Sequence, residues 1–171
     1  MRDKFLRDIS HIDPQTIFFL DEFGFDTHQK YSFAWGKKGE RIYENKKGSK
    51  GERINTIACL NNDRNLFAGF VFSGSCNRDV FDVYIEEVLL PQLDSGSTVV
   101  MDNASFHKSS NVEIILSKKN CSVLYLPSYS PDLNPIEESW FPLKNDLKKR
   151  FLEAVDNPLE TVIDVVKKRS I

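Results

Sequence analysis

Residues 17–25 read IFFLDEFGF, in which a run of four apolar residues leads directly into an acid. A short, continuous apolar run of this kind is typical of a strand buried in the middle of a sheet. INTIACL (54–60) and LFAGFVFSG (66–74) have a similar β-branched and aromatic character and are separated by the turn NNDRN. We therefore predict three strands with hairpin-type connections. The long connection lies before Arg53 and contains YSFAWG (31–36) and a Gly- and Lys-rich loop.

The hydrophobic period changes after the third predicted strand. Phe81, Tyr84, Ile85 and Val88 follow the i, i+3, i+4, i+7 spacing of one helix face, and Asn77 stands where an N-cap belongs. The segment that begins at Asn77 is therefore predicted to be a helix.

Strands and helices alternate in the rest of the chain. Strands are predicted at STVVM (97–101) and CSVLYL (121–126), and helices at NVEIILSKK (111–119), from about Pro135, and over 158–168. Three antiparallel strands followed by alternating strands and helices are typical of a mixed α/β sheet with helices on both faces. The 171 residues can bury a sizeable core and show no internal repeat or linker, so we predict a single domain over 1–171.

The composition is that of a globular protein without low-complexity tracts, and the net charge is only −2. Cys59, Cys76 and Cys121 lack the paired spacing of zinc sites, and an odd number of widely separated cysteines fits a reducing compartment. No apolar run approaches the roughly 18 residues that a membrane span needs. These features predict a cytoplasmic protein without membrane contact.

Basic residues concentrate in two places although the total charge is nearly balanced. Residues 37–53 contain seven lysines and arginines against three acids, and a second basic cluster lies in the helix predicted from Pro135. Such segments suit a polyanion such as DNA, although lysines also often only solvate a hairpin or a helix face. The candidate DNA contacts are Lys37, Lys38, Arg41, Lys46, Lys47, Lys144 and Lys148.

Three acids stand out as candidate site residues: Asp21, Asp102 and Glu137. The two aspartates stand at the ends of predicted strands, and the glutamate stands near the start of a predicted helix. Each also has a structural explanation, because aspartates often cap turns and glutamates often complement a helix dipole.

A second helix start in this sequence shows that a glutamate can occur in the position of Glu137 for structural reasons alone. Residues 134–137 (NPIE) and 157–160 (NPLE) both place Asn before Pro and a Glu two residues after it. This helix-starting chemistry needs no active site, and we expect Asn134 to act as a helix cap. Glu137 differs from Glu160 because it follows an apolar strand and a prolyl turn and precedes two aromatic residues at i+3 and i+4.

Carboxylates gathered at the ends of buried strands are hard oxygen ligands of the kind that Mg²⁺ and Mn²⁺ prefer. Two such ions about 3.5–4 Å apart can activate an attacking water or hydroxyl and stabilise the leaving oxygen of a phosphoryl displacement. The three acids therefore indicate a nuclease or strand-transfer site.

These motifs resemble those of the DDE superfamily of transposases, specifically the bacterial insertion-sequence branch related to mariner elements. The resemblance covers nearly the whole chain and rests on LDEFGF (20–25), AWGKKGER (34–41), VVMDNASFHKS (99–109) and LPSYSPDLNPIEESWFPLK (126–144). Thirty-four residues separate Asp102 from Glu137, which is the spacing typical of this branch, whereas Glu138 would give thirty-five. Helical periodicity also favours Glu137, because Glu138 is rotated by about 100° onto a polar face.

The resemblance implies an RNase H-like fold, cleavage of DNA at transposon ends, and joining of the cut strand to a target. It implies that Asp21, Asp102 and Glu137 bind two ions of Mg²⁺ or Mn²⁺, and that Asn103 and His107 support the site or the DNA strand. The alternative for His107 is a partly buried histidine that serves only the structure.

Transposases of this kind carry helix-turn-helix DNA-binding modules ahead of the catalytic domain, and twenty residues precede Asp21 in this sequence. We therefore expect those modules to be absent, and expect a homodimer or a separate N-terminal DNA-binding half as a partner. Two other readings stay open: a catalytically silent remnant that binds DNA or a partner protein, and an RNA–DNA hybrid nuclease of the same fold. Pro142 is expected to kink the helix just beyond Glu137.

Overall fold

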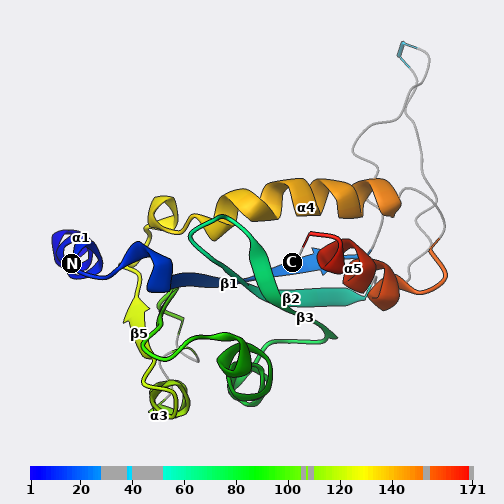
Figure 1. Cartoon of the computed structure of the whole chain (residues 1–171). Coiled ribbons are helices and arrows are strands. Elements are labelled where there is room, and N and C mark those ends of the chain that lie inside the picture. The colour runs from blue at the N-terminus through cyan, green and yellow to red at the C-terminus, as the bar shows by residue number, and fades with distance from the viewer. Residues whose placement is uncertain (28–37, 40–51, 105–106, 108–109, 152–154, 170–171) are drawn as a thin grey trace.

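A five-stranded mixed sheet forms the centre of the computed structural model, which describes residues 1–27, 38–39, 52–104, 107, 110–151 and 155–169 (Figure 1). The strands are β1 (Ile17–Asp26), β2 (Arg53–Leu60), β3 (Leu66–Ser73), β4 (Thr98–Met101) and β5 (Ser122–Tyr125). Their order across the sheet is β3-β2-β1-β4-β5, with β1, β2 and β3 antiparallel and β4 and β5 parallel to β1. The predicted mixed sheet is therefore confirmed.

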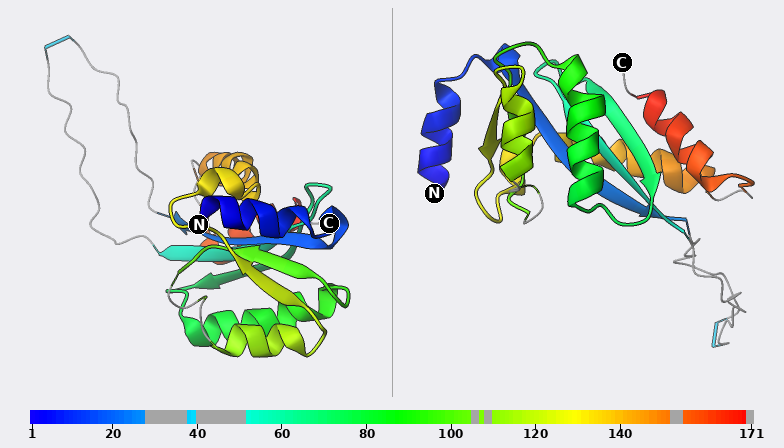
Figure 2. Two further views of the ribbon diagram at one scale, coloured as in Figure 1. Left: turned by 90° about the vertical axis from the view of Figure 1, so that its left-hand side faces the viewer. Right: turned by 90° about the horizontal axis from the view of Figure 1, so that it is seen from below.

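Helices cover both faces of this sheet (Figures 1 and 2). The α-helices are α1 (Arg2–Ser10), α2 (Arg78–Val83), α3 (Ser110–Ser117), α4 (Ile136–Arg150) and α5 (Pro158–Lys167). Shorter segments are the 3₁₀ turns η1 (Pro14–Thr16), η3 (Leu90–Gln92) and η4 (Pro131–Leu133), and the π-helical η2 (Tyr84–Leu89) that continues α2. Within the described residues, no helix is long and apolar enough to cross a bilayer.

The core has one apolar cluster on each side of the sheet. On one side, Leu20 of β1 packs with residues of α2, η2 and α3, while on the other side Phe23 of β1 packs with α4 and α5. Strand β2 is buried along almost its whole length because it has helices over both faces. A third, smaller cluster contains Phe5, the single buried residue of α1, and attaches this helix to the sheet. We did not predict α1 from the sequence.

Strand β1 is longer than predicted, and this changes the position of Asp21. The ladder between β1 and β2 runs from Phe19 to Asp26, so the strand continues through the acids that we expected to end it. Backbone pairing therefore outweighs the polar side chains. Because successive side chains point to opposite faces of a sheet, Asp21 faces α4 and its neighbour Glu22 faces α2.

The helix predicted from Asn77 is confirmed at its start, where the Asn77 side chain accepts a hydrogen bond from Val80 N at 2.9 Å. Its later part is π-helical rather than α-helical. The helix predicted from about Pro135 is also confirmed, and it continues to Arg150 with Pro142 inside it.

The two Asn-Pro helix starts differ, contrary to our prediction for Asn134. Their backbones are nearly the same, with φ −112° and ψ 94° at Asn134 and φ −128° and ψ 94° at Asn157. Asn157 caps its helix by accepting from Glu160 N at 3.2 Å. The Asn134 side chain instead is buried, and its Oδ1 has no hydrogen-bond partner among the described residues. With nearly the same backbone at both positions, the difference lies in the side chains, of which only that of Asn157 accepts from a backbone N–H of its helix.

This difference predicts unequal effects of the two alanine substitutions on stability. Asn157→Ala should lower the free energy of unfolding by about 1 kcal/mol because it removes a helix cap. Asn134→Ala should cost less or even stabilise, because an unpaired buried polar atom is itself unfavourable by about 1–3 kcal/mol. Urea unfolding of the two variants beside the wild type measures both changes. An equal loss of stability in both variants would contradict the assignment.

Candidate active site

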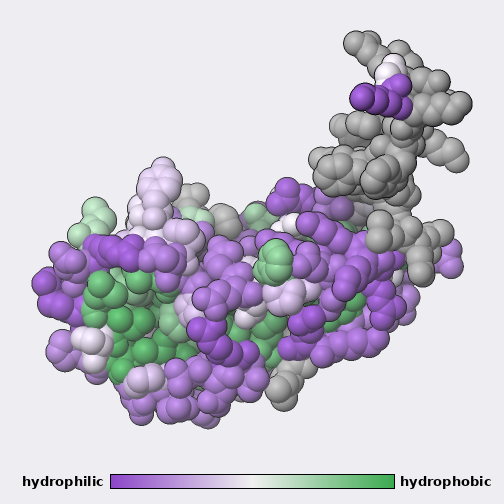
Figure 3. Space-filling view, turned by 90° about the horizontal axis from the view of Figure 1, so that it is seen from above, coloured by the Kyte–Doolittle hydropathy of each residue, from purple (hydrophilic) through white to green (hydrophobic). Residues whose placement is uncertain are grey.

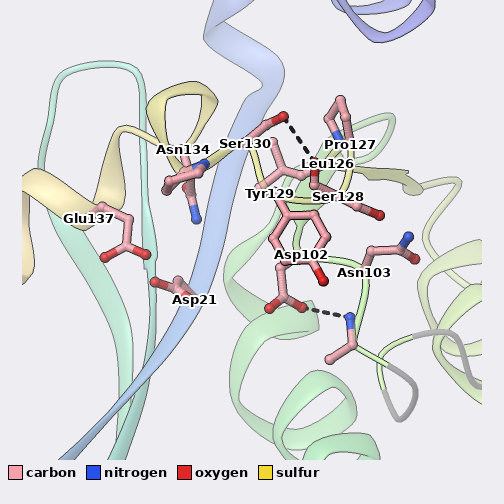
Figure 4. Close-up of a pocket in the computed structure, with 12 residues that line it drawn as sticks. Asp21, Asp102, Asn103, Leu126, Pro127, Ser128, Tyr129, Ser130, Asn134 and Glu137 are labelled. Atoms are coloured by element: carbon pink, nitrogen blue, oxygen red, sulfur yellow. Dashed lines mark hydrogen bonds between the residues drawn. The ribbon is translucent and has the colours of Figure 1, made fainter. Parts of the chain in front are cut away.

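Three acids that are far apart in the sequence line one cavity of about 350 Å³ (Figure 4). Asp21 comes from β1, Asp102 directly follows β4, and Glu137 lies in the first turn of α4. They line the same cavity because β4 runs parallel to β1 beside it, and α4 packs on the same strand. The remaining wall consists of Asn103, Ala104, the loop residues 126–131 and Asn134.

Asp21 is half-buried and accepts a hydrogen bond from the indole Nε1 of Trp140 at 2.8 Å. Burial raises the pKa of Asp21 to about 6; the Trp140 bond opposes this shift, and the charges of Glu137 and Asp102 add to it. The carboxylate is thus held in place, but burial and the neighbouring acids disfavour its charged form. A cation in the cavity would stabilise that charged form.

Asp102 has a different environment. Its Oδ1 accepts hydrogen bonds from Ala104 N at 2.9 Å and from His107 Nδ1 at 2.5 Å. The His107 bond is the main reason why the pKa of Asp102 lies below its usual value. This acid is therefore stabilised in its charged form.

His107 joins Asp102 to a second carboxylate. Its Nε2 lies 2.8 Å from Oε1 of Glu22, so each ring nitrogen faces an acceptor and the doubly protonated ring donates to both. Burial alone would lower the pKa of His107, but the hydrogen bonds and charges of Asp102 and Glu22 raise it to about 9. The ring is therefore charged at neutral pH.

Glu137 and Glu138 are both exposed but face different surroundings. Glu137 lines the cavity, and Figure 4 shows its carboxylate directed toward Asp21. Glu138 forms an ion pair with Arg64 on the surface. The structure thus places Glu137, and not Glu138, with the other two acids.

The two supporting residues expected from the sequence lie at the site. Asn103 lines the cavity, and its Oδ1 is buried without a hydrogen-bond partner among the described residues. His107 is 2% exposed, so it contacts Asp102 from the protein side rather than from solvent. Their roles in a reaction stay predictions.

The predicted basic contacts are only partly visible. Lys144 lies over the ring of Phe23, with its Nζ 5.4 Å from the ring centroid, while Lys38 and Lys148 are exposed. Figure 3 shows that the face over α4 is largely hydrophilic, with a hydrophobic area toward the end that carries α1. Outside the described residues lie Lys37, Arg41, Lys46 and Lys47.

Three residues at the site were missed as functional candidates. In the sequence, Trp140 is only the aromatic residue three positions after Glu137, yet in the structure it is the donor that holds Asp21. Glu22 could have been suspected, because strand alternation turns it toward the apolar face opposite Asp21. Tyr129 had no sequence signal that we used; its side chain is fully exposed at the cavity, and its φ of 55° is left-handed.

The donor set suits a hard divalent cation, but the carboxylates do not yet converge. Among the described residues, no group of three or more His, Cys, Asp or Glu side chains is arranged to hold a metal ion. The chemistry nevertheless fits, because a half-buried carboxylate with a raised pKa lies beside two further carboxylates. The residues that would hold a metal are Asp21, Asp102 and Glu137.

The contrast between the two aspartates predicts opposite effects of neutral substitution in metal-free buffer. The folded-state pKa of Asp21 exceeds its unfolded value, so the contribution of Asp21 to wild-type stability falls as the pH rises from about 4 to about 6. At pH 7, Asp21→Asn should therefore be more stable than the wild type by about 2 kcal/mol, and this gain should vanish near pH 4.

Asp102→Asn should be less stable than the wild type at pH 7. The depressed pKa of Asp102 contributes stability above its unfolded pKa, and this contribution is lost as the pH falls. Urea unfolding in EDTA between pH 4 and pH 7 measures both variants. If Asp21→Asn and Asp102→Asn changed the free energy of unfolding at pH 7 in the same direction, the opposite electrostatic environments assigned to the two aspartates would be wrong.

One known protein and two solved structures show what this chain is similar to. The Tcb1 transposase of Caenorhabditis briggsae is 33% identical over 79 residues, which are 44% of this chain and 29% of that protein. The Mos1 mariner paired-end complex with Mn matches 98% of this chain and 57% of its own chain, with a TM-score of 0.62 and 17% identity. The Mos1 catalytic domain with raltegravir and Mg matches 96% of this chain and 75% of its own, with a TM-score of 0.62 and 16% identity.

The structural matches show the fold, and a family model shows the family. The sheet and its helices match the RNase H-like fold of the Mos1 catalytic domain, as the sequence resemblance implied. The chain spans less than a third of the Tcb1 transposase and a little over half of the Mos1 chain in its DNA complexes. The family model of the DDE superfamily endonucleases matches residues 16–157, and the chain therefore belongs to this family.

Proposed function

We propose that this chain is the catalytic domain of a DNA transposase, which cleaves DNA phosphodiester bonds and transfers the cut strand with the help of divalent metal ions. The observation that carries the proposal is the meeting of Asp21, Asp102 and Glu137 in one cavity of a DDE endonuclease fold. Each acid comes from a different element, so the fold itself assembles the site.

Within this proposal, Asp21, Asp102 and Glu137 hold two ions of Mg²⁺ or Mn²⁺. Such ions would activate the attacking oxygen and stabilise the leaving oxygen of the phosphodiester. The structures of Mos1 transposase with Mn and with Mg support this choice of metal. Trp140 keeps Asp21 directed into the cavity, and His107 does the same for Asp102.

DNA is the proposed partner. The exposed ring of Tyr129 at the cavity offers a face on which a base can stack, and Lys144 and Lys148 of α4 offer positive charge for the backbone. Transposon ends and a target duplex are proposed as substrates. A second copy of the chain or a separate DNA-binding half would complete the assembly, and the paired-end Mos1 complexes support this arrangement by analogy.

The alternative, a catalytically silent domain that binds DNA or a partner protein, is less well supported. A silent domain has no need to keep three carboxylates in one cavity, where burial already opposes the ionisation of Asp21. An RNA–DNA hybrid nuclease would use the same acids, and a comparison of hybrid and duplex substrates distinguishes it.

Glu137→Gln should reduce Mg²⁺-dependent nicking of a supercoiled plasmid by at least about 100-fold, because a lost metal ligand costs several kcal/mol of transition-state stabilisation. Glu138→Gln is the matched control, since it removes the same charge from the next residue and breaks only the surface pair with Arg64. It should stay within about twofold of the wild type. Equal background nicking by all three proteins would favour the silent domain.

Mg²⁺ should stabilise the wild type more than Asp102→Asn. At ten times the Kd, a bound ion adds about 1.4 kcal/mol, which corresponds to a rise in Tm of about 3–6 °C for a chain of this size. Scanning calorimetry with and without Mg²⁺ measures the shift, and Asp146→Asn serves as a distant surface control. The site would be rejected if the wild type and Asp102→Asn shifted equally.

A further inference from the structure

Glu22 is an acid of β1 that the proposed reaction does not use. It follows Asp21 directly but faces the opposite side of the sheet, where its side chain is 19% exposed. Its Oε1 lies 2.8 Å from Nε2 of His107. Glu22 thus lies on the far side of the sheet from Asp21 and is linked through His107 to Asp102, which lines the cavity.

His107 is fixed on every side. The ring packs on Phe81 with 4.3 Å between ring centroids, and the His107 main-chain oxygen accepts a hydrogen bond from the Tyr125 hydroxyl at 2.9 Å. Its main-chain nitrogen donates to Ala104 O at 3.1 Å. With the residue 2% exposed, the imidazole has little freedom to turn. A partner on Nε2 therefore also fixes the direction in which Nδ1 points.

At the other nitrogen, the histidine fixes Asp102. Oδ1 of Asp102 receives two hydrogen bonds, from His107 and from Ala104 N, whereas Oδ2 receives none from the residues that the structure describes. Within the described part of the chain, one oxygen of this carboxylate is thus engaged by the protein, and the other accepts no hydrogen bond.

We propose that Glu22 is a positioning residue, which through His107 fixes Asp102 so that Oδ2 alone is offered to a divalent ion. This inference rests on the proposed function and assigns Glu22 a part in it without contact to metal or DNA. Ligating carboxylates and histidines are commonly oriented by such outer partners, whose loss weakens metal affinity by about 10- to 100-fold.

A carboxylate suits this position for two reasons. It accepts a hydrogen bond from Nε2 at 2.8 Å and so holds the buried ring with Nδ1 directed at Asp102. A carboxylate oxygen also makes a stronger, charge-assisted hydrogen bond than an amide oxygen does. Glutamine at position 22 keeps the shape but removes the charge, and aspartate keeps the charge but shortens the reach.

The test measures Mn²⁺ binding to the metal-free protein by the EPR signal of free Mn²⁺, which is independent of activity. Glu22→Gln should raise the Kd by about 10- to 100-fold. The matched control is Glu86→Gln, which removes one negative charge from a surface pair with Lys118 and should stay within about twofold. Equal Kd values for Glu22→Gln and Glu86→Gln would overturn the positioning role.

A double-mutant cycle separates this role from a general effect on folding or charge. Because Glu22 acts through Asp102, Glu22→Gln should change the Kd little in an Asp102→Asn background, and additive effects would overturn the inference. Should Glu22→Gln fail to fold, Glu22→Asp replaces it: weaker binding is expected from the lost reach, and a wild-type Kd would overturn the inference.

The same titration distinguishes failure of this inference from failure of the proposed function. If Mn²⁺ binds the wild type and is lost in Asp21→Asn, the metal site stands whatever Glu22 does. If the wild type and Asp21→Asn bind Mn²⁺ equally, the proposed site fails, and the positioning role of Glu22 fails with it.

Discussion

The hydrogen bond from Trp140 Nε1 to Asp21 Oδ2 is the contact on which both the core and the candidate site depend. Trp140 is 1% exposed and packs on Phe23 of β1, with 4.7 Å between ring centroids. The apolar body of the indole seats α4 on the sheet, while its single N–H points at the acid of the same strand. Since Glu137 lies one turn earlier on this helix, the packing that buries Trp140 also brings two acids together.

The two faces of the sheet thus hold different acids. On the α4 face, Trp140 holds Asp21, whereas on the α2 face Glu22 and His107 hold Asp102. The electrostatic results are opposite, because burial disfavours the charge of Asp21 and the imidazolium favours the charge of Asp102. In the absence of a cation, the charge of Asp21 lowers the stability of the fold, whereas the charge of Asp102 raises it. Such a local loss of stability is expected at a functional site.

Much of this arrangement could be predicted from the sequence, because strands and helix faces follow from hydrophobic period. The mixed sheet and the helix that carries Glu137 were predicted in this way and are confirmed. The extent of β1 could not be predicted, because its second half depends on pairing with β2 rather than on its own residues. Helix α1 escaped notice because only Phe5 of its nine residues is buried.

The site residues that escaped prediction depend on side-chain direction, which a sequence pattern does not specify. Asn134 and Asn157 share the same local sequence and nearly the same backbone, but only Asn157 caps its helix. Glu22 and His107 stand 85 positions apart, and only the fold brings them into contact. Motif spacing identified which acids to consider, whereas the partners that orient them became visible only in three dimensions.

A crystal structure of the chain soaked in Mn²⁺, with anomalous scattering used to locate the metal, tests directly whether the three acids bind a divalent ion. We expect an anomalous peak inside the cavity, coordinated by Asp21, Glu137 and Oδ2 of Asp102, with the Trp140 and His107 hydrogen bonds intact. A cavity without a peak at millimolar Mn²⁺, or a peak bound by other residues, would contradict this expectation.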